Sequence, residues 1–138
     1  YHMSNINAAI GLQQLKKFDA MNKRKIAVAR KYDEAFKDSK GITLLRTEDY
    51  KDIGLFVYIV KINKGRNELM DHLTRNGVGS GIHYIPSHLF TFYKNARCHL
   101  PVTEQIYDEI LTLPLFPDIT DAQVEKVIKA VKSGISNT

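Results

Sequence analysis

The sequence is short of cysteine, proline and tryptophan, and it has no long hydrophobic run. Its one cysteine, Cys98, cannot form an internal disulfide. No apolar run approaches the roughly 20 residues that span a bilayer, and none follows a basic leader. These absences argue against a disulfide-stabilised secreted domain and against a membrane protein, so we expect a reducing, cytoplasmic setting.

Metal-ligand motifs and strong charge of one sign are also missing. His83, His88, Cys98 and His99 show neither C-x-x-C nor H-x-x-x-H spacing, so we expect no metal site. Lysine and arginine exceed aspartate and glutamate by only 20 to 15, which gives a net charge of +5. This mild excess favours anionic partners, such as phosphorylated ligands or nucleic acid, without choosing among them.

What the sequence does contain is the composition of a globular domain. Hydrophobic residues make up 43% and charged residues 25% of its 138 residues. A chain of this length buries one core without disulfides or a structural metal. We therefore predict a single domain over residues 1–138.

The first part of the chain predicts one long helix over residues 4–40, with Ser4 as its N-cap and Gly41 as its stop. At 1.5 Å per residue, roughly 36 residues give a rod of about 54 Å. Leu12 and Leu15 lie off the main apolar stripe, so this half of the helix needs cover from outside the domain. The stripe itself has helical spacing and consists of Ile6, Ile10, Phe18, Met21, Val28, Tyr32 and Phe36.

The remainder predicts alternating strands and helices. Strands are expected at residues 42–45, 55–62 and 78–84, helices at 66–76, from Pro101 through Ile110 and from Thr120 to about Gly134, a loop at 85–100 and an extended segment at 113–117. Thr120 and Gln123 have the spacing of a capping box. The predicted fold class is α+β: a long helix (1–40), then a subdomain (41–138) with a small, mainly antiparallel sheet, centred on strand 55–62, and helices on one face.

A first candidate site follows the glycine-rich segment 77–81, where glycines allow close approach of a ligand or a neighbouring backbone. The segment follows a helix, so a dinucleotide-binding loop is disfavoured. His83 and Tyr84 come directly after the predicted strand and His88 lies beyond Pro86, so we expect three polar rings to meet at the start of the loop. The alternative is an ordinary hydrogen-bonded strand end.

The loop that follows interleaves aromatic and basic residues, namely Phe90, Phe92, Tyr93, Lys94 and Arg97. Such side chains stack on bases and neutralise phosphates in nucleotide or single-strand binding. They serve equally well as buried anchors of a loop. Neither motif decides the function.

Three segments together carry more information than either motif. Residues 1–12 read YHMSNINAAIGL, residues 77–88 read GVGSGIHYIPSH, and residues 113–117 read LPLFP. In this order, over almost the whole chain, they resemble segments in the last third of nucleotide-sugar aminotransferases of the DegT/StrS type. These are homodimeric enzymes with the aspartate-aminotransferase fold that depend on pyridoxal phosphate.

The resemblance implies that this chain is the small, C-terminal domain of such an enzyme. In the family, a large domain binds the cofactor, and the amino group, usually from glutamate, passes to a keto-sugar linked to a nucleotide for polysaccharide or glycoconjugate biosynthesis. The lysine that holds the cofactor belongs to the large domain and is not in this chain. We therefore expect the chain alone to be inactive and to bind no cofactor, and its partners to be its own large domain and a second subunit.

The resemblance also assigns site residues. It places His83, Tyr84, His88, Tyr93 and Lys94 near the substrate, and Tyr1, His2 and Ser4 near the cofactor. Many members have arginine at the position of His2, so this chain departs from the family at a position that would bind an anion.

Three alternatives stay open. A dehydratase of the same family removes a sugar hydroxyl and has histidine in place of the catalytic lysine, a difference that lies outside this chain. A basic α+β module that binds nucleic acid would function without any upstream sequence and would bind with a steep salt dependence. A purely structural dimerisation domain would use the His83 region for assembly only. We expect neither nucleic acid nor membrane as a partner.

Overall fold

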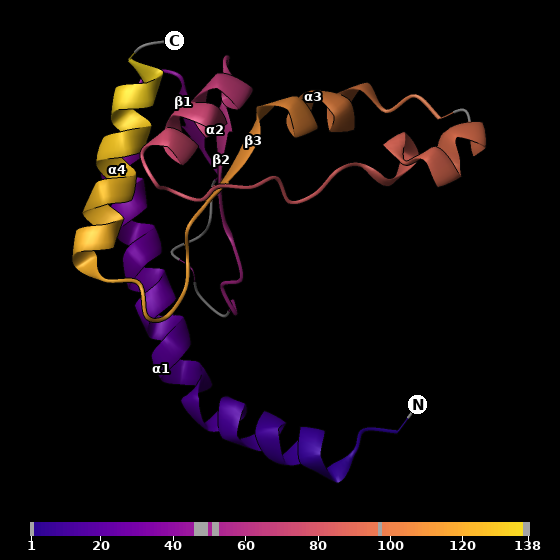
Figure 1. Ribbon diagram of the computed structural model, residues 1–138, viewed down its shortest axis with the longest axis vertical. Helices are drawn as coiled ribbons and strands as arrows, with labels where there is room; N and C mark the ends of the chain where they lie inside the picture. The colour runs from indigo at the N-terminus through magenta and orange to yellow at the C-terminus, as the bar shows by residue number, and fades with distance from the viewer. Residues whose placement is uncertain (1, 46–49, 51–52, 97, 137–138) are drawn as a thin grey trace.

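The structure, a computed structural model, describes residues 2–45, 50, 53–96 and 98–136. A three-stranded antiparallel sheet of order β1-β2-β3 carries helices α1, α2 and α4 on one face (Figure 1). The elements are α1 (Asn5–Phe36), β1 (Ile42–Leu44), β2 (Tyr58–Ile62), α2 (Arg66–Arg75), the 3-10 helices η1 (Ser87–Leu89) and η2 (Thr91–Ala96), α3 (Pro101–Glu109), β3 (Ile110–Leu113) and α4 (Asp121–Ile135). No helix in these ranges is long and apolar enough to cross a membrane.

Strand β2 is the centre of the sheet. It pairs antiparallel with β1, where Ile42 lies opposite Ile62, and with β3, where Tyr58 lies opposite Leu113. Side chains alternate between the two faces of a strand. Tyr58, Val60 and Ile62 are buried while the residues between them are half-buried, so one face of β2 carries the core. The expected central strand is confirmed, although it begins at residue 58 rather than 55.

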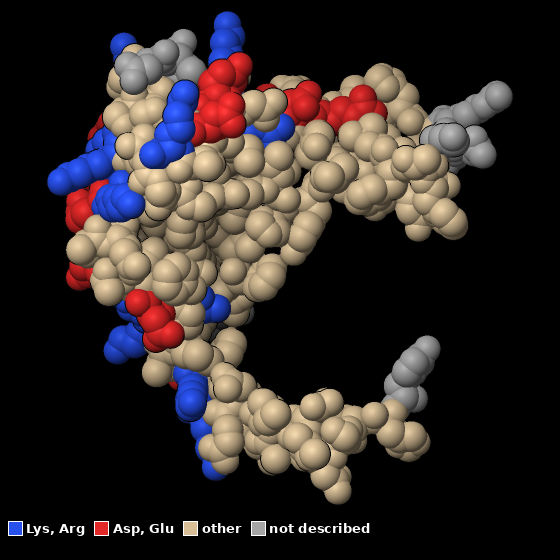
Figure 2. Space-filling view, in the orientation of Figure 1, with Lys and Arg blue, Asp and Glu red and all other residues tan. Residues whose placement is uncertain are grey.

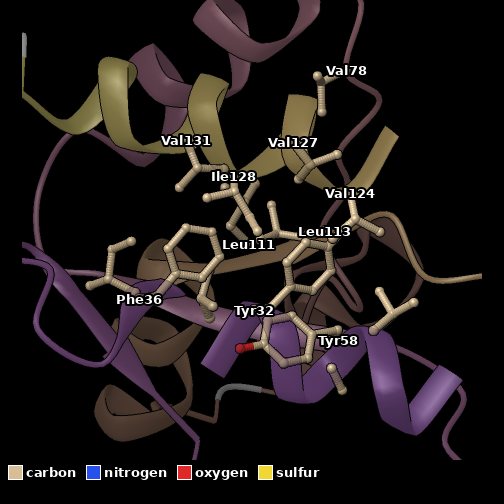
Figure 3. Packing of buried hydrophobic residues seen from close by; sticks show 14 of the residues in the cluster. Tyr32, Phe36, Tyr58, Val78, Leu111, Leu113, Val124, Val127, Ile128 and Val131 are labelled. Carbon is tan, nitrogen blue, oxygen red and sulfur yellow. The ribbon is translucent and has the colours of Figure 1, made fainter. Parts of the chain in front are cut away.

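The core lies between this face and the helices. The ring of Tyr32 in α1 lies 5.0 Å from that of Tyr58 and 6.0 Å from that of Phe36. Figure 3 shows α4 above them, with Val127 and Val131 directed at the same cluster. Fully burying a side chain of this size stabilises a fold by about 1.5–3 kcal/mol. This arrangement confirms the predicted fold class.

A polar cluster beneath the aromatic rings attaches α1 to the sheet. Asp33 accepts hydrogen bonds from the hydroxyls of Tyr50, at 2.6 Å, and Tyr58, at 2.7 Å. The hydroxyl of Tyr32 donates to the carbonyl of Pro114 at 2.9 Å. Burial raises the pKa of Tyr32, and burial together with the Asp33 hydrogen bond raises that of Tyr58. Both hydroxyls therefore stay protonated, as donors must.

A second attachment joins α1 to the start of α4. Arg24 donates to the carbonyl of Ile119 at 2.5 Å and to the Asp121 carboxylate at 2.8 Å, and Lys31 lies 3.0 Å from the same carboxylate. Hydrogen bonds from both cations lower the pKa of Asp121, and the bond from Arg24 has the larger effect. Thr120 and Gln123 form the expected capping box at this end of α4.

Only the second half of α1 is covered. Val28, Ala29, Tyr32 and Phe36 are its buried residues, and the helix ends at Phe36, before the expected stop at Gly41. Its first half presents large apolar residues to solvent: Ile6, Ile10, Leu12, Leu15 and Phe18, with Ile6 74% exposed. The prediction that this half has no cover within its own domain agrees with these exposures.

Two strand predictions were wrong. Residues 78–84 form no strand, because only Gly81 pairs with a neighbour, as an isolated bridge to Thr112. Residues 110–113, ascribed to the end of a helix and the start of an extended segment, are the buried edge strand β3. The sequence ILTL at positions 110–113 has no polar alternation, since both of its faces are covered.

Residues 83–109 leave the sheet and return to it as a projection that we call the arm. It contains η1, η2 and α3, so the expected loop with little regular structure is confirmed as two short 3-10 turns. Two apolar residues of α3 are not buried: Val102 is 69% exposed, and Ile106 is also exposed. The arm and the first half of α1 extend in the same direction, so the molecule has the outline of a crescent (Figure 1).

The contact between α2 and α4 generates a first prediction. A Cβ added at Gly134 would lie 2.5 Å from Leu69 Cδ1 and 2.9 Å from His72 Cδ2. Gly134→Ala should therefore lower the free energy of unfolding by about 1–3 kcal/mol, the usual cost of overpacking, despite the better helix propensity of alanine. Chemical denaturation followed by circular dichroism measures this change.

The matched control is Gly11→Ala in the exposed half of α1. A Cβ at Gly11 meets no atom of the described residues within 4 Å. This variant should be neutral or more stable by up to about 1 kcal/mol. Equal effects of the two substitutions would contradict the packing of α2 against α4.

Candidate functional site

The site expected near His83 lies where the arm leaves the sheet. A shallow depression of about 440 Å³ is present there, lined by Gly79, Ser80, Gly81, His83, Thr112, Leu113, Pro114 and Phe116. In β3, Leu111 and Leu113 belong to the core, so Thr112 between them is directed to the opposite face of the sheet. The site and the main core therefore share one strand and use its two sides.

The backbone at Gly81 fixes the geometry of the depression. Its N–H donates to the carbonyl of Thr112 at 3.2 Å, and its carbonyl accepts from the N–H of Thr112 at 2.8 Å. A Cβ at Gly81 would lie 3.3 Å from His83 Cε1. Glycine at this position thus lets the His83 ring fold back over its own backbone, which is the close approach expected for this segment.

His83 and Tyr84 form a pair at the edge of the depression. His83 Nδ1 lies 3.0 Å from the hydroxyl oxygen of Thr112, and its ring meets the Tyr84 ring edge to face, with centroids 4.8 Å apart. The contact at Nδ1 orients the imidazole and leaves Nε2 available for a ligand. His83 is half-buried, whereas Tyr84 is 68% exposed. The arrangement presents one fixed nitrogen and one accessible phenol.

His88 has a different environment. Its Nε2 lies 2.9 Å from Glu104 Oε1, which also accepts from the N–H of Leu100, and its side chain is only 9% exposed. The hydrogen bond from His88 is the main cause of a lowered pKa at Glu104. The pair ties η1 to the first turn of α3. His88 thus supports the arm from within, in a contact separate from the pair of His83 and Tyr84.

The aromatic residues at the far end of the arm are exposed. Phe92 is 87% exposed and meets the half-exposed ring of Tyr93 edge to face, with centroids 5.0 Å apart. Within this chain they are therefore not the buried anchors considered above. Lys94 belongs to η2, and its side chain lies outside the described residues.

The three residues expected near a cofactor lie at the start of the chain. Tyr1 is outside the described residues. His2 is exposed, and the Ser4 hydroxyl accepts a hydrogen bond from the Asn7 N–H at 3.2 Å, as the N-cap of α1. Ser4 thus fulfils its structural prediction, while its role near a cofactor stays a prediction.

Sequence analysis missed two residues of this region, Thr112 and Glu104. Thr112 is buried and orients His83, but it lies in a strand that the pattern did not reveal. Glu104 orients His88 across a gap of 16 residues, which no local motif encodes. Glu104 also accepts from the N–H of Leu100, the N-cap of α3, but leucine at the N-cap gives no capping motif in the sequence.

The chemistry of the depression limits what it holds. Its lining residues include neither lysine nor arginine nor a carboxylate. Within the described ranges, no three histidine, cysteine or acidic side chains lie close enough to bind a metal ion. A phosphate-bearing cofactor that needs a lysine does not fit these residues by themselves. They suit a neutral, hydroxyl-rich ligand that hydrogen bonds to histidine, threonine and backbone groups.

The surface around the site is divided by charge. Figure 2 shows Lys, Arg, Asp and Glu side chains mainly on the convex side of the crescent, with both signs mixed. The inner surfaces of the arm and of the first half of α1 are mostly uncharged in this view. The concave side is therefore poor in charge where this view shows it.

The sequence pattern of the DegT/DnrJ/EryC1/StrS aminotransferase family matches residues 1–132. This chain belongs to that family.

Similar proteins support the assignment. The chain is 31% identical to the uncharacterized protein MJ1066 of Methanocaldococcus jannaschii, over 99% of this chain and 38% of that protein. It superimposes with a TM-score of 0.90 on the aminotransferase TlmJ from Streptoalloteichus hindustanus, at 27% identity over 96% of this chain and 36% of that one. The PLP form of the sugar aminotransferase Spr1654 from Streptococcus pneumoniae, described as putative, gives 0.89 at 27% identity, over 99% and 36%. This chain thus spans little more than a third of these relatives.

The pair of His88 and Glu104 generates a second prediction. Glu104→Ala removes the acceptor for both His88 and the Leu100 N–H, so amide exchange at Leu100 and across η1 should accelerate at least about tenfold. Hydrogen exchange followed by mass spectrometry or NMR measures this rate. Asp108→Ala, on the exposed side of α3, is the control and should leave the exchange unchanged.

Unchanged exchange in the Glu104 variant would show that the arm is held by other contacts.

The contact between His88 and Glu104 should also weaken in acid. A carboxylate whose pKa is lowered by folding contributes stability above its unfolded pKa, and this contribution is lost as the pH falls through the folded value. The exchange in wild type, corrected for the intrinsic pH dependence of amide exchange, should therefore approach that of the variant as the pH falls below the ordinary pKa of a glutamate.

Proposed function

We propose that this chain is the C-terminal domain of a pyridoxal-phosphate-dependent enzyme that transfers an amino group, from glutamate, to a keto-sugar linked to a nucleotide. In this proposal residues 1–40 form the helix between domains and residues 41–138 the small domain. The supporting observation is the oriented pair of His83 and Tyr84 beside an open, uncharged depression, in a chain that matches the family over residues 1–132.

The residues present suit binding of the sugar substrate rather than cofactor chemistry. In this proposal His83 Nε2 and the Tyr84 hydroxyl hydrogen bond with sugar hydroxyls, and the contact of His83 with Thr112, which orients the imidazole, supports this role. The exposed rings of Phe92 and Tyr93 provide flat apolar surfaces for a nucleotide base. The lysine that holds the cofactor, and the cofactor chemistry with it, belong to residues outside this chain.

The uncovered surfaces support the proposed partners. Large apolar side chains are exposed along the first half of α1 and the outer part of the arm. Monomeric soluble proteins rarely expose large contiguous apolar surfaces. In our proposal the large domain and a second subunit of a homodimer cover them. The alternative of a nucleic-acid-binding module lacks a basic face in Figure 2, because the visible cations are mixed with acids on the convex side. The cytoplasmic setting stays a prediction.

A third prediction tests the role of His83 in the complete enzyme. His83→Ala should lower kcat/KM for the keto-sugar nucleotide by one to two orders of magnitude, roughly 1.4–2.8 kcal/mol of transition-state binding. The affinity for cofactor should stay unchanged, because His83 faces a depression without cationic residues. Steady-state kinetics and a cofactor titration give the two quantities.

His99→Ala is the matched control, since His99 is an exposed histidine of the same arm. Its kinetics should equal those of wild type. Loss of cofactor affinity in the His83 variant, or unchanged kinetics, would identify His83 as a structural strand end. Identification of the sugar product distinguishes amination from removal of a hydroxyl, the reaction of the family's dehydratases.

A fourth prediction concerns the chain by itself. Incubated with pyridoxal phosphate and then reduced with borohydride, the 138-residue chain should show no stoichiometric adduct at a single lysine. Activation of a lysine requires a desolvated pocket, and the site described above contains no lysine. Intact-mass spectrometry and peptide mapping measure the adduct, and one specifically modified lysine would overturn the prediction.

A further inference from the structure

Arg66 is a buried cation at the second root of the arm, where α3 continues into β3. It is the first residue of α2 and is only 7% exposed. Its Nη1 donates to the carbonyl of Ile110 at 3.3 Å, and its guanidinium carbon lies 5.6 Å from the centre of the Tyr107 ring. One side chain from the body of the domain thus meets both the last turn of α3 and the first residue of β3.

Burial of the Arg66 guanidinium lowers the stability of the fold unless all of its polar atoms are paired. Its Nε is buried without a hydrogen-bond partner among the residues that the structure describes. Burying an incompletely paired charge costs several kcal/mol in general, and an apolar side chain of similar volume is often as good for stability. Packing alone therefore gives a poor account of arginine at position 66.

The position of the guanidinium suggests what it does. It lies at the C-terminal end of α3, where the helix dipole and free carbonyls favour a cation. An ion pair of 2.7 Å between Lys61 of β2 and Glu109 supports the same turn from the sheet. Since α3 is otherwise poorly covered, these contacts set the direction in which the arm projects from the sheet.

We propose that Arg66 is a positioning residue that fixes the angle of the arm through Ile110 and Tyr107. As a consequence it determines where the arm presents Tyr93 to the substrate, beside the pair of His83 and Tyr84 at the other root. This consequence rests on the function proposed above, whereas the mechanical role of Arg66 does not.

The mechanical role can be measured in the 138-residue chain. Cys98 is its only cysteine, is exposed and lies on the arm. A second spin label at Lys129→Cys, on the exposed side of α4, gives a distance between arm and body by pulsed electron paramagnetic resonance. Arg66→Met should broaden the distance distribution about twofold, because it removes the hydrogen bond and the cation while keeping an apolar side chain.

Further variants separate this role from a general loss of stability. Arg66→Lys keeps a cation without the planar fork and should restore part of the narrow distribution. Tyr107→Leu removes the aromatic ring that Arg66 contacts on the arm and should also broaden the distance distribution. This second variant tests the proposal if Arg66→Met fails to fold. Arg75→Met, at the exposed end of the same α2 helix, is the control and should leave the distribution unchanged.

The consequence for substrate is tested in the complete enzyme. A loosened arm spends less time in the binding-competent orientation, so Arg66→Met should raise KM for the sugar nucleotide about tenfold with kcat changed less than about twofold. An unchanged distance distribution in both Arg66→Met and Tyr107→Leu would overturn the positioning role. A lowered kcat at unchanged KM would overturn its link to substrate. Absence of aminotransferase activity in wild type would refute the proposed function but leave the distance measurement valid.

Discussion

The pairing of β3 with β2 is the constraint on which the other features of this molecule depend. Leu111 and Leu113 enter the core beneath α1 and α4, while Thr112 between them faces the opposite side and orients His83. The carbonyl of Ile110, at the start of the same strand, accepts the Arg66 hydrogen bond. Four consecutive residues thus connect the hydrophobic core, the candidate site and the root of the arm. A shift of register by one residue would exchange core and site.

The domain has one closed core and two extensions whose apolar side chains are largely exposed. The sheet, α2, α4 and the second half of α1 form a closed core that contains the fully buried side chains. The first half of α1 joins this core near Asn22 and Arg24, which bond to residues 53–55 and to the start of α4. The arm joins it through the Gly81 bridge, Arg66 and the ion pair of Lys61 with Glu109. The exposed apolar residues of these extensions support the proposal that other parts of a longer protein cover them.

Polar groups in this domain orient neighbouring groups more than they react. Asp33 accepts hydrogen bonds from two tyrosine hydroxyls, and Glu104 bonds to His88 and to a backbone amide. The Thr112 hydroxyl contacts Nδ1 of His83. Apart from the contact of Glu104 with the nearby Leu100 amide, these contacts join residues at least 16 positions apart in the sequence. The result is a rigid frame with a few ligand-facing groups, which is consistent with a domain that presents substrate to chemistry performed elsewhere.

The sequence by itself determined the features that rest on local pattern: the long helix with Ser4 as its N-cap, the central strand, the capping box of Thr120 and Gln123, and the family resemblance through three ordered motifs. These signals depend on neighbours a few residues apart. It failed at residues 78–84 and 110–113. The pattern of the glycine-rich segment 78–84 predicts a strand, although only Gly81 pairs with a neighbour. Strand 110–113 is buried on both faces, so its sequence lacks the alternation of polar and apolar residues that predicts a strand.

Only the tertiary structure decided which of the expected site residues act together. Local spacing placed His83, Tyr84 and His88 in one group, but Thr112 and Glu104, from a missed strand and a distant helix, draw the two histidines into separate contacts. Burial of Arg66 was equally hidden, because its partners lie more than 40 residues away. Side-chain orientation is set by contacts across the fold, and a single sequence without those contacts carries no periodic signal of them.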